Sequence, residues 1–225
     1  MMKPMEVRLV GRFRFCNRLP GQHESMFYRA IHSQTNEFLV LKGEEAKGGR
    51  AKRGCLSLLQ EGKLYQSMQG GIGIPYMHWC GQEEDYNFIV LEELSTTLAT
   101  LQTRCGGKFS LKTALMLGSQ LVNSLQYFHF KYFVFNNINP RHIMTGSGEK
   151  SNKVFLIDFS RAVRYKDPQT QEHIGGVDRP GEAKVYNMEF SSIHFQKGGT
   201  VSRRDDMESL LYWLAYMIRG SLPWS

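Results

Sequence analysis

The sequence has few cysteines and no long apolar run. Its four cysteines are widely spaced, form no C-x-x-C pair and have no histidine nearby at metal-ligand spacing. Zinc sites and disulfide frameworks are therefore unsupported, which favours a reducing intracellular compartment, the cytoplasm or the nucleus. No segment approaches the roughly 18 apolar residues that a membrane span needs, and the N-terminus lacks the apolar run of a secretory signal. We expect no membrane association.

The composition is that of an ordinary folded chain. Hydrophobic residues make up 41% and charged residues 22%, which disfavours disordered, collagen-like and disulfide-scaffold classes. At roughly 150 residues per domain, 225 residues fit one large domain or two small lobes. Lys and Arg number 28 against 21 Asp and Glu, a net charge of +7. Such a chain is attracted to acidic or phosphate-rich partners, and charge alone does not separate nucleotides from nucleic acids.

The first part of the chain is rich in strand patterns. Residues 7–40 alternate apolar and polar side chains and predict three antiparallel strands. After a basic glycine-containing stretch, residues 55–68 have helical apolar spacing, and Gly70 and Gly71 end the predicted helix. Residues 86–94 read as a buried strand.

The second part is rich in helix patterns. Residues 110–130 predict a long helix, and a short apolar strand then stops at the carboxylate of Asp158. Residues 160–200 have the irregular, glycine-containing composition of a long surface loop. Residues 203–220 predict a last helix that is apolar on nearly all sides between Leu210 and Ile218, a pattern typical of a helix buried all round.

Six motifs follow one another along the chain: YQSMQGGIGIP, HWCGQEEDYN, KFSLKTAL, FLIDFSRAVRYKD, SRRDDMESL and GSLPW. Together they resemble the casein kinase 1 family of Ser/Thr protein kinases from Gly11 to the last residue. The resemblance implies an α+β, two-lobed protein kinase-like fold. A small antiparallel-sheet lobe with one helix covers about residues 7–92. A hinge lies near Glu92 to Leu94, and a mainly helical large lobe covers about residues 95–225, shortened after its central helix.

The resemblance implies that part of an ATP site is retained. Lys42 matches the strand lysine, Glu61 the helix glutamate that positions it, and Asp158 the metal-binding aspartate, whose alternative role is a turn cap. Glu92 and Leu94 match the hinge beside the nucleotide. These residues imply ATP and Mg²⁺ binding that is weak or absent.

The catalytic loop departs from the family pattern. Where H-R-D-x-K-P-x-N is expected, residues 135–142 read F-N-N-I-N-P-R-H. Asn137 replaces the catalytic base, and a neutral amide cannot take up a hydroxyl proton. Asn139 replaces a phosphate-facing lysine, and we expect both asparagines to keep the hydrogen bonds of the loop. His142 replaces a metal-binding asparagine. An imidazole suits zinc, copper or iron better than magnesium, and we favour a hydrogen-bonded structural histidine over a metal ligand.

Two further segments depart from the pattern. The three loop glycines are replaced by Pro20, Gln22 and Ser25, and Glu24 places a carboxylate where phosphate charge is expected. In the substrate-facing segment, Glu189 replaces a positive residue, and the match of Arg179 to a family arginine is weakened by an insertion nearby. Recognition of acidic or phosphorylated peptides at this segment is therefore in doubt.

Asp206 matches a buried aspartate at the start of the family's central helix. The resemblance gives this residue a structural role, in which it organises the catalytic loop from beneath. Tyr212, Trp213, Tyr216 and Met217 are core residues by default, but with no following helices to cover them some are expected to be exposed.

Three functions remain open. Loss of a general base typically costs about 10² to 10⁴ in rate, or roughly 3 to 5 kcal/mol. The leading hypothesis is therefore a casein kinase 1-like pseudokinase that acts as a protein-interaction or regulatory module. The proteins it binds are expected to include substrates or partners of active casein kinase 1 relatives. The alternative is a residual Ser/Thr kinase that transfers the γ-phosphate of ATP to proteins. A remote alternative is a nucleic-acid-binding protein that uses Lys47, Arg50, Lys52 and Arg53, a basic run without an accompanying aromatic platform.

Overall fold

The chain has an α+β fold made of two compact units. The computed structural model describes residues 8–19, 26–46, 55–174 and 188–224. The smaller unit combines Met1–Lys52, Leu56–Gln69 and Pro75–Glu93, and the larger unit combines Arg53–Cys55, Gly70–Ile74 and Leu94–Ser225.

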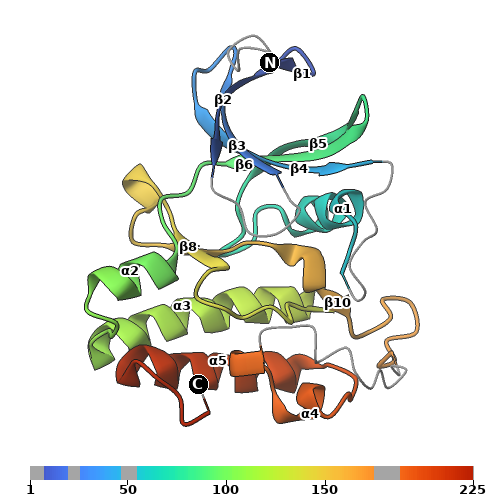
Figure 1. Cartoon of the computed structure of the whole chain (residues 1–225). Helices are drawn as coiled ribbons and strands as arrows, with labels where there is room; N and C mark the ends of the chain where they lie inside the picture. The colour runs from blue at the N-terminus through green and yellow to red at the C-terminus, as the bar shows by residue number, and fades with distance from the viewer. Residues whose placement is uncertain (1–7, 20–25, 47–54, 175–187, 225) are drawn as a thin grey trace. The chain divides into compact units, whose positions relative to one another are not determined.

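An antiparallel sheet of six strands forms most of the smaller unit, in the order β1-β2-β3-β4-β6-β5 (Figure 1). The strands are β1 (Arg8–Leu9), β2 (Phe13–Leu19), β3 (Met26–His32), β4 (Phe38–Glu45), β5 (Met77–Glu83) and β6 (Tyr86–Glu92). The three strands predicted before residue 40 are confirmed as β2, β3 and β4, and the predicted buried strand is β6. Strand β5 was not predicted, because its sequence MHWCGQE has no strict alternation.

One face of this sheet carries the core of the smaller unit. Strand alternation puts Phe13 of β2, Ala30 of β3, Leu39 and Leu41 of β4 and Val90 of β6 on the same side, where each is at most 1% exposed. The unit's helix therefore packs against the opposite face of the sheet.

Among its described residues the smaller unit has one helix, α1 (Leu58–Met68), as predicted from residues 55–68. It begins with a capping box, in which the Ser57 side chain accepts from the backbone N–H of Gln60 and the Gln60 side chain accepts from the N–H of Ser57. The helix ends before Gly70, whose φ of +79° favours glycine. Within α1, a Cβ atom at Gly62 would collide with Sγ of Cys80 on β5, so the helix packs at close range on the sheet.

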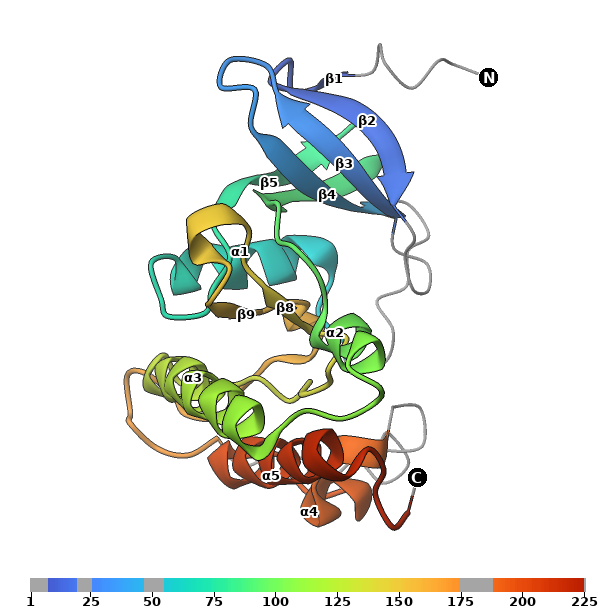
Figure 2. The ribbon, with the colours of Figure 1, turned by 90° about the vertical axis from the view of Figure 1, so that its left-hand side faces the viewer.

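The larger unit is mainly helical. Its helices are α2 (Leu98–Arg104), α3 (Leu111–Phe130), α4 (Ile193–Gln196) and α5 (Arg203–Arg219). Two short antiparallel pairs join β7 (Phe133–Val134) to β10 (Val163–Arg164) and β8 (Ile143–Thr145) to β9 (Val154–Leu156). Helices α3 and α5 lie side by side in Figures 1 and 2 and pack closely where Leu214 approaches Gly118.

Helix α5 is buried on one side only, so the prediction of burial all round is wrong. Leu210, Trp213 and Met217 are at most 1% exposed, whereas Leu211 is 63% exposed. The positions of the three buried residues differ by three and four, which is the spacing of one helix face. The apolar composition of a helix shows that every side of it could be buried. It does not show how many other elements pack against it. Of the four residues expected to be partly exposed, Trp213 and Met217 are buried and Tyr212 and Tyr216 are half-buried, so the expected exposure is not seen at these positions.

Two other predictions for the larger unit need correction. Helix α2 was not predicted; Thr97 caps it by accepting from the N–H of Thr100, but its short sequence has little apolar periodicity. Residues 160–200 are not all irregular, because β10, α4 and the short 3₁₀ turns η2 (Phe159–Arg161) and η4 (Met188–Phe190) lie there. A further turn, η1 (Gly148–Lys150), precedes β9.

The close contact at Gly62 gives a test of the smaller unit. Alanine normally stabilises a helix interior by roughly 0.5 to 1 kcal/mol relative to glycine. We predict the opposite sign here: Gly62→Ala lowers the free energy of unfolding by about 1 to 3 kcal/mol, because the new methyl group meets Cys80. Urea denaturation measures the change, and Cys80→Ala in the same chain should recover most of it. A stabilised Gly62→Ala single variant would show that the packing is looser than described.

Candidate functional site

A buried ion pair joins the sheet and the helix of the smaller unit. Lys42 on β4 places Nζ 2.7 Å from Oε2 and 3.0 Å from Oε1 of Glu61 on α1. The Lys42 and Glu61 residues are 9% and 1% exposed. The two residues that the sequence singled out are therefore brought together within one unit.

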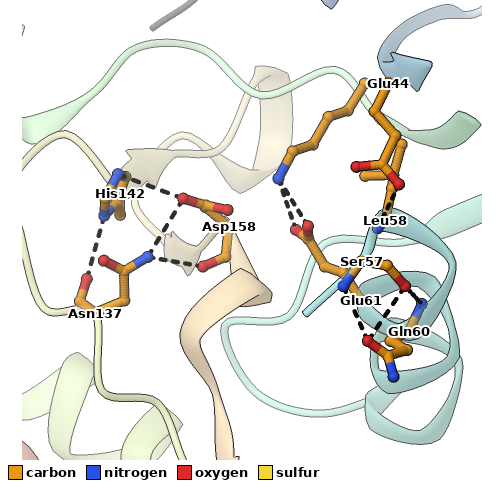
Figure 3. A network of polar contacts seen from close by, with 9 residues as sticks. Glu44, Ser57, Leu58, Gln60, Glu61, Asn137, His142 and Asp158 are labelled. Atoms are coloured by element: carbon orange, nitrogen blue, oxygen red, sulfur yellow. Dashed lines mark hydrogen bonds and ion pairs between the residues drawn. The ribbon is translucent and has the colours of Figure 1, made fainter. Parts of the chain in front are cut away.

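The first turn of α1 is fastened to the sheet beside this pair. Oε1 of Glu44 accepts from Nδ2 of Asn87 at 3.3 Å. The same oxygen accepts from the backbone N–H of Leu58 at 2.9 Å (Figure 3). Together with the capping box at Ser57 and Gln60, this contact fixes where α1 begins. Glu61, one turn into the helix, is thereby held in reach of Lys42.

Apolar side chains flank Lys42 on its face of the sheet. Lys42 pairs directly with Phe27 of β3 and with Ile89 of β6, and directly paired residues share a face. Val40 lies two residues before Lys42 and therefore on that face as well. In such surroundings the attraction between two opposite charges is stronger than in water, and breaking the pair leaves an uncompensated buried charge.

The residues predicted as a hinge lie at the boundary of the two units, between Glu93 and Leu94. Glu92 ends β6 and makes two hydrogen bonds to Tyr76, each of 2.8 Å. The backbone N–H of Glu92 donates to the Tyr76 carbonyl, and Oε1 of Glu92 accepts from the Tyr76 N–H. Arg29 holds Glu93 through two hydrogen bonds of 2.5 and 2.9 Å. Leu94 is 8% exposed.

In the larger unit, one buried carboxylate organises the loop that follows α3. Asp206 on α5 is 2% exposed and accepts from the backbone N–H groups of Phe135 and Asn136, each at 2.8 Å. Its Oδ2 also lies 2.8 Å from Nε2 of His129, near the end of α3. The structural role predicted for Asp206 is confirmed. Sequence reasoning missed His129, although a histidine in the last turn of a helix is a recognisable signal.

Asn137, His142 and Asp158 form a polar cluster in the same unit (Figure 3). Nδ2 of Asn137 donates to the backbone carbonyl of Asp158 at 3.0 Å and to its Oδ2 at 3.3 Å. Nε2 of His142 lies 3.6 Å from the same Oδ2, and its Nδ1 lies 3.3 Å from the carbonyl of Asn137. The Asn137 amide therefore presents hydrogen-bond donors to Asp158.

The hydrogen bonds of the loop bear on the predictions for Asn139, His142 and Asp158. Oδ1 of Asn139 accepts from the N–H of Arg141, and the backbone carbonyl of Asn139 accepts from the N–H of His142, each at 2.9 Å. Asn139 thus keeps hydrogen bonds of the loop, as predicted. His142 is hydrogen-bonded, as expected of a structural histidine. Asp158 stands at the N-cap position of η2, and its side chain makes no capping hydrogen bond to that turn. Asp158 adopts a φ of +62°, an uncommon backbone conformation for aspartate.

This cluster is a poor match for Mg²⁺. Magnesium prefers six oxygen ligands in an octahedron, whereas the side chains here are one carboxylate, one imidazole and one amide whose nitrogen faces the carboxylate. Across the part of the chain that the structure describes, no group of three or more His, Cys, Asp or Glu side chains could hold a metal ion.

The predicted site residues thus fall into two groups in different units: Lys42 and Glu61 in the smaller, and Asn137, His142 and Asp158 in the larger. Other predicted residues lie outside the described residues. They are the glycine-loop positions Pro20, Gln22, Glu24 and Ser25, the basic run Lys47, Arg50, Lys52 and Arg53, and Arg179 of the substrate-facing segment.

Comparison with known families gives no assignment, because no protein-family model matches the chain. Within the described residues, no helix has both the length and the apolar character needed to span a membrane.

The Lys42–Glu61 pair predicts strong coupling in a double-mutant cycle. Lys42→Met and Glu61→Leu alone should each lower the free energy of unfolding by about 3 to 5 kcal/mol, because each strands a buried charge. The double variant removes both charges and should cost clearly less than the sum. Guanidinium denaturation of the four proteins measures the cycle. Losses that add within about 0.5 kcal/mol would falsify the coupling.

Introducing a carboxylate at position 137 should destabilise the larger unit. Asn137→Asp replaces a donor to Asp158 with a second negative charge at the same contact, and we expect a loss of about 1 to 3 kcal/mol at neutral pH. The repulsion requires both carboxylates to be ionised, so the loss should shrink as the pH falls toward 4. Denaturation at pH 7.5 and pH 4.5, with Asn139→Asp as the comparison, tests this. A loss independent of pH would argue against charge repulsion.

Proposed function

We propose that the chain is a casein kinase 1-like pseudokinase, a kinase-fold module that acts mainly through protein interaction. Three features support the proposal. The smaller unit is an antiparallel sheet with one helix and a buried lysine–glutamate pair. The larger unit is mainly helical, with a buried aspartate that holds the loop after α3. The family motifs occur in family order along both units.

The contact between Asn137 and Asp158 is the main support for proposing that the chain is catalytically inactive. A kinase needs a carboxylate at this position to accept the proton of the substrate hydroxyl. Here the side chain is an amide that donates to Asp158 and is 8% exposed. Because Asp206 holds the preceding residues of the loop, the amide is fixed in this donating role.

The smaller unit supports weak nucleotide binding. In the protein-kinase signature, an alanine stands two residues before the lysine and a valine two residues after the third glycine. These positions are Val40 and Phe27 in this chain, and both side chains share the Lys42 face of the sheet. The larger side chains leave less room for a nucleotide base beside the lysine. Lys42 itself, held by Glu61, still offers an ammonium group to a phosphate.

A residual Ser/Thr kinase is the second candidate, favoured by the intact Lys42–Glu61 pair. A kinase that turns over at about 1 to 100 per second would fall to roughly one per second at best and 10⁻⁴ per second at worst once its base is lost. The two candidates therefore differ in measurable turnover.

Phosphate transfer to casein separates the two. We expect the full chain to transfer no phosphate from ATP above background, with Mg²⁺ or with Mn²⁺. The control variants are Asp158→Asn and the double variant Lys42→Met/Glu61→Leu, which removes the ammonium without stranding a buried charge. Turnover above background, anywhere between about 10⁻⁴ and one per second or faster, that disappears in both variants would overturn the pseudokinase proposal.

Nucleotide binding has a separate readout in thermal stability. With ATP at ten times its Kd, binding stabilises the folded state by about 1.4 kcal/mol, which raises Tm by about 3 to 6 °C in a chain of this size. We expect the rise to persist in EDTA, because the cluster at Asp158 does not suit Mg²⁺, and to vanish in the Lys42→Met/Glu61→Leu variant. A rise that requires Mg²⁺ and is lost in Asp158→Asn would contradict this.

A further inference from the structure

The larger unit carries a cluster of aromatic and basic side chains that the proposed function does not use. We call it the basic aromatic surface, and it consists of Tyr127, Phe130, Lys131, Tyr132, Phe133, Arg164 and Lys166. It lies wholly within the described residues and depends on neither the ion pair at Lys42 nor the cluster at Asp158.

Backbone pairing makes this surface continuous. Residues 127–133 run from the last turns of α3 into β7, and β7 pairs with β10 so that Phe133 lies directly opposite Arg164. The pairing extends by one hydrogen bond of 3.0 Å, from the N–H of Tyr165 to the carbonyl of Tyr132. Two segments about 30 residues apart in the sequence are thereby joined.

Each cation of this surface lies over an aromatic ring. The guanidinium carbon of Arg164 is 4.6 Å from the ring centre of Phe133. Nζ of Lys166 is 5.6 Å from the ring centre of Tyr132, and Nζ of Lys131 is 5.6 Å from that of Tyr127. Such contacts restrict long basic side chains while leaving their charge available, since a ring does not neutralise it.

The positive charge of the surface is only partly offset. Among the residues that the structure describes, Lys131, Arg164 and Lys166 form no ion pair within 4.0 Å. Asp167 follows Lys166 in the sequence, but its Oδ1 accepts from the N–H groups of Gln169 at 2.7 Å and Thr170 at 3.0 Å. Hydrogen bonds from the backbone of Thr170 and Gln169 lower the pKa of Asp167, with a smaller contribution from Arg164.

An apolar side chain adjoins these charges. Phe130, the last residue of α3, is 75% exposed and immediately precedes Lys131. An exposed phenylalanine next in sequence to a lysine of this surface adds an apolar group to its cations, and interface centres are enriched in aromatic residues and arginine.

We propose that the basic aromatic surface docks an acidic segment of a protein partner that presents one apolar side chain among its carboxylates. The three cations fit the carboxylates, and Phe130 fits the apolar side chain. Single-stranded nucleic acid fits less well, because such sites stack successive bases on open rings. Here Tyr127, Tyr132 and Phe133 each have a cation over the ring.

Fluorescence anisotropy of the full chain with a labelled peptide tests the proposal. The probe is a 12-residue peptide of glutamate and serine with one central phenylalanine. We expect the double variant Arg164→Gln/Lys166→Gln to raise its Kd about tenfold at 50 mM salt, and rather less at 300 mM salt, where screening weakens exposed charges. The matched control is Arg104→Gln/Lys112→Gln, which removes the same charge from exposed positions, Lys112 lying about 27 Å from Phe130 along α3. The control should change Kd less than twofold.

The role of Phe130 has its own control. Phe130→Ser should weaken binding of the phenylalanine peptide about fivefold and leave binding of the same peptide with serine at its centre unchanged. If the two charge variants raised the Kd of the peptide equally, binding would depend on net charge alone, which would overturn the proposal. So would tighter binding of a labelled 12-nucleotide oligothymidine through the same residues, or no peptide binding at millimolar concentration. None of these outcomes bears on nucleotide binding at Lys42, so the two proposals fail separately.

Discussion

The carboxylate of Asp206 is the contact on which the larger unit depends. It receives two backbone N–H groups from the loop after α3 and lies against His129 of α3 itself. Backbone donors that are buried must find partners, and a carboxylate satisfies several at once. Because Asp206 belongs to the first turn of α5, the same group ties that helix to α3 and sets the course of the chain toward Asn137.

The two polar clusters use opposite solutions to the same electrostatic problem. In the smaller unit a buried lysine and a buried glutamate neutralise one another, which keeps an ammonium ion inside a mostly apolar setting. In the larger unit the Asp158 carboxylate accepts from the Asn137 amide and lies 3.6 Å from the His142 imidazole. The first arrangement preserves a charge that a phosphate could use, whereas the second occupies a carboxylate with its own neighbours.

Sequence reasoning succeeded where a local pattern has one physical solution. Alternation fixed β2, β3 and β4, and the spacing of apolar residues fixed α1 and α3. It failed where burial depends on elements distant in the sequence. Leu211 is exposed because of which elements pack against α5, and the sequence of the helix does not contain that information.

The same division holds for the polar residues. Motif context predicted that Lys42 would meet Glu61, but the donation from Asn137 to Asp158 arises from two loops that only the fold places together. The cations stacked on rings at Phe133 and Tyr132 likewise need the pairing of β7 with β10, which no local pattern contains.

The contact between Gly62 and Cys80 has a consequence for chemical labelling. The Cys80 thiol faces α1, and its pKa is raised by burial and, to a lesser degree, by the charge of Glu61. Since thiolates and not thiols react with alkylating agents, Cys80 is slow to react while the helix stays in place. The alkylation rate of this cysteine therefore reports how often α1 leaves the sheet, so the chain contains its own probe for the opening of its smaller unit.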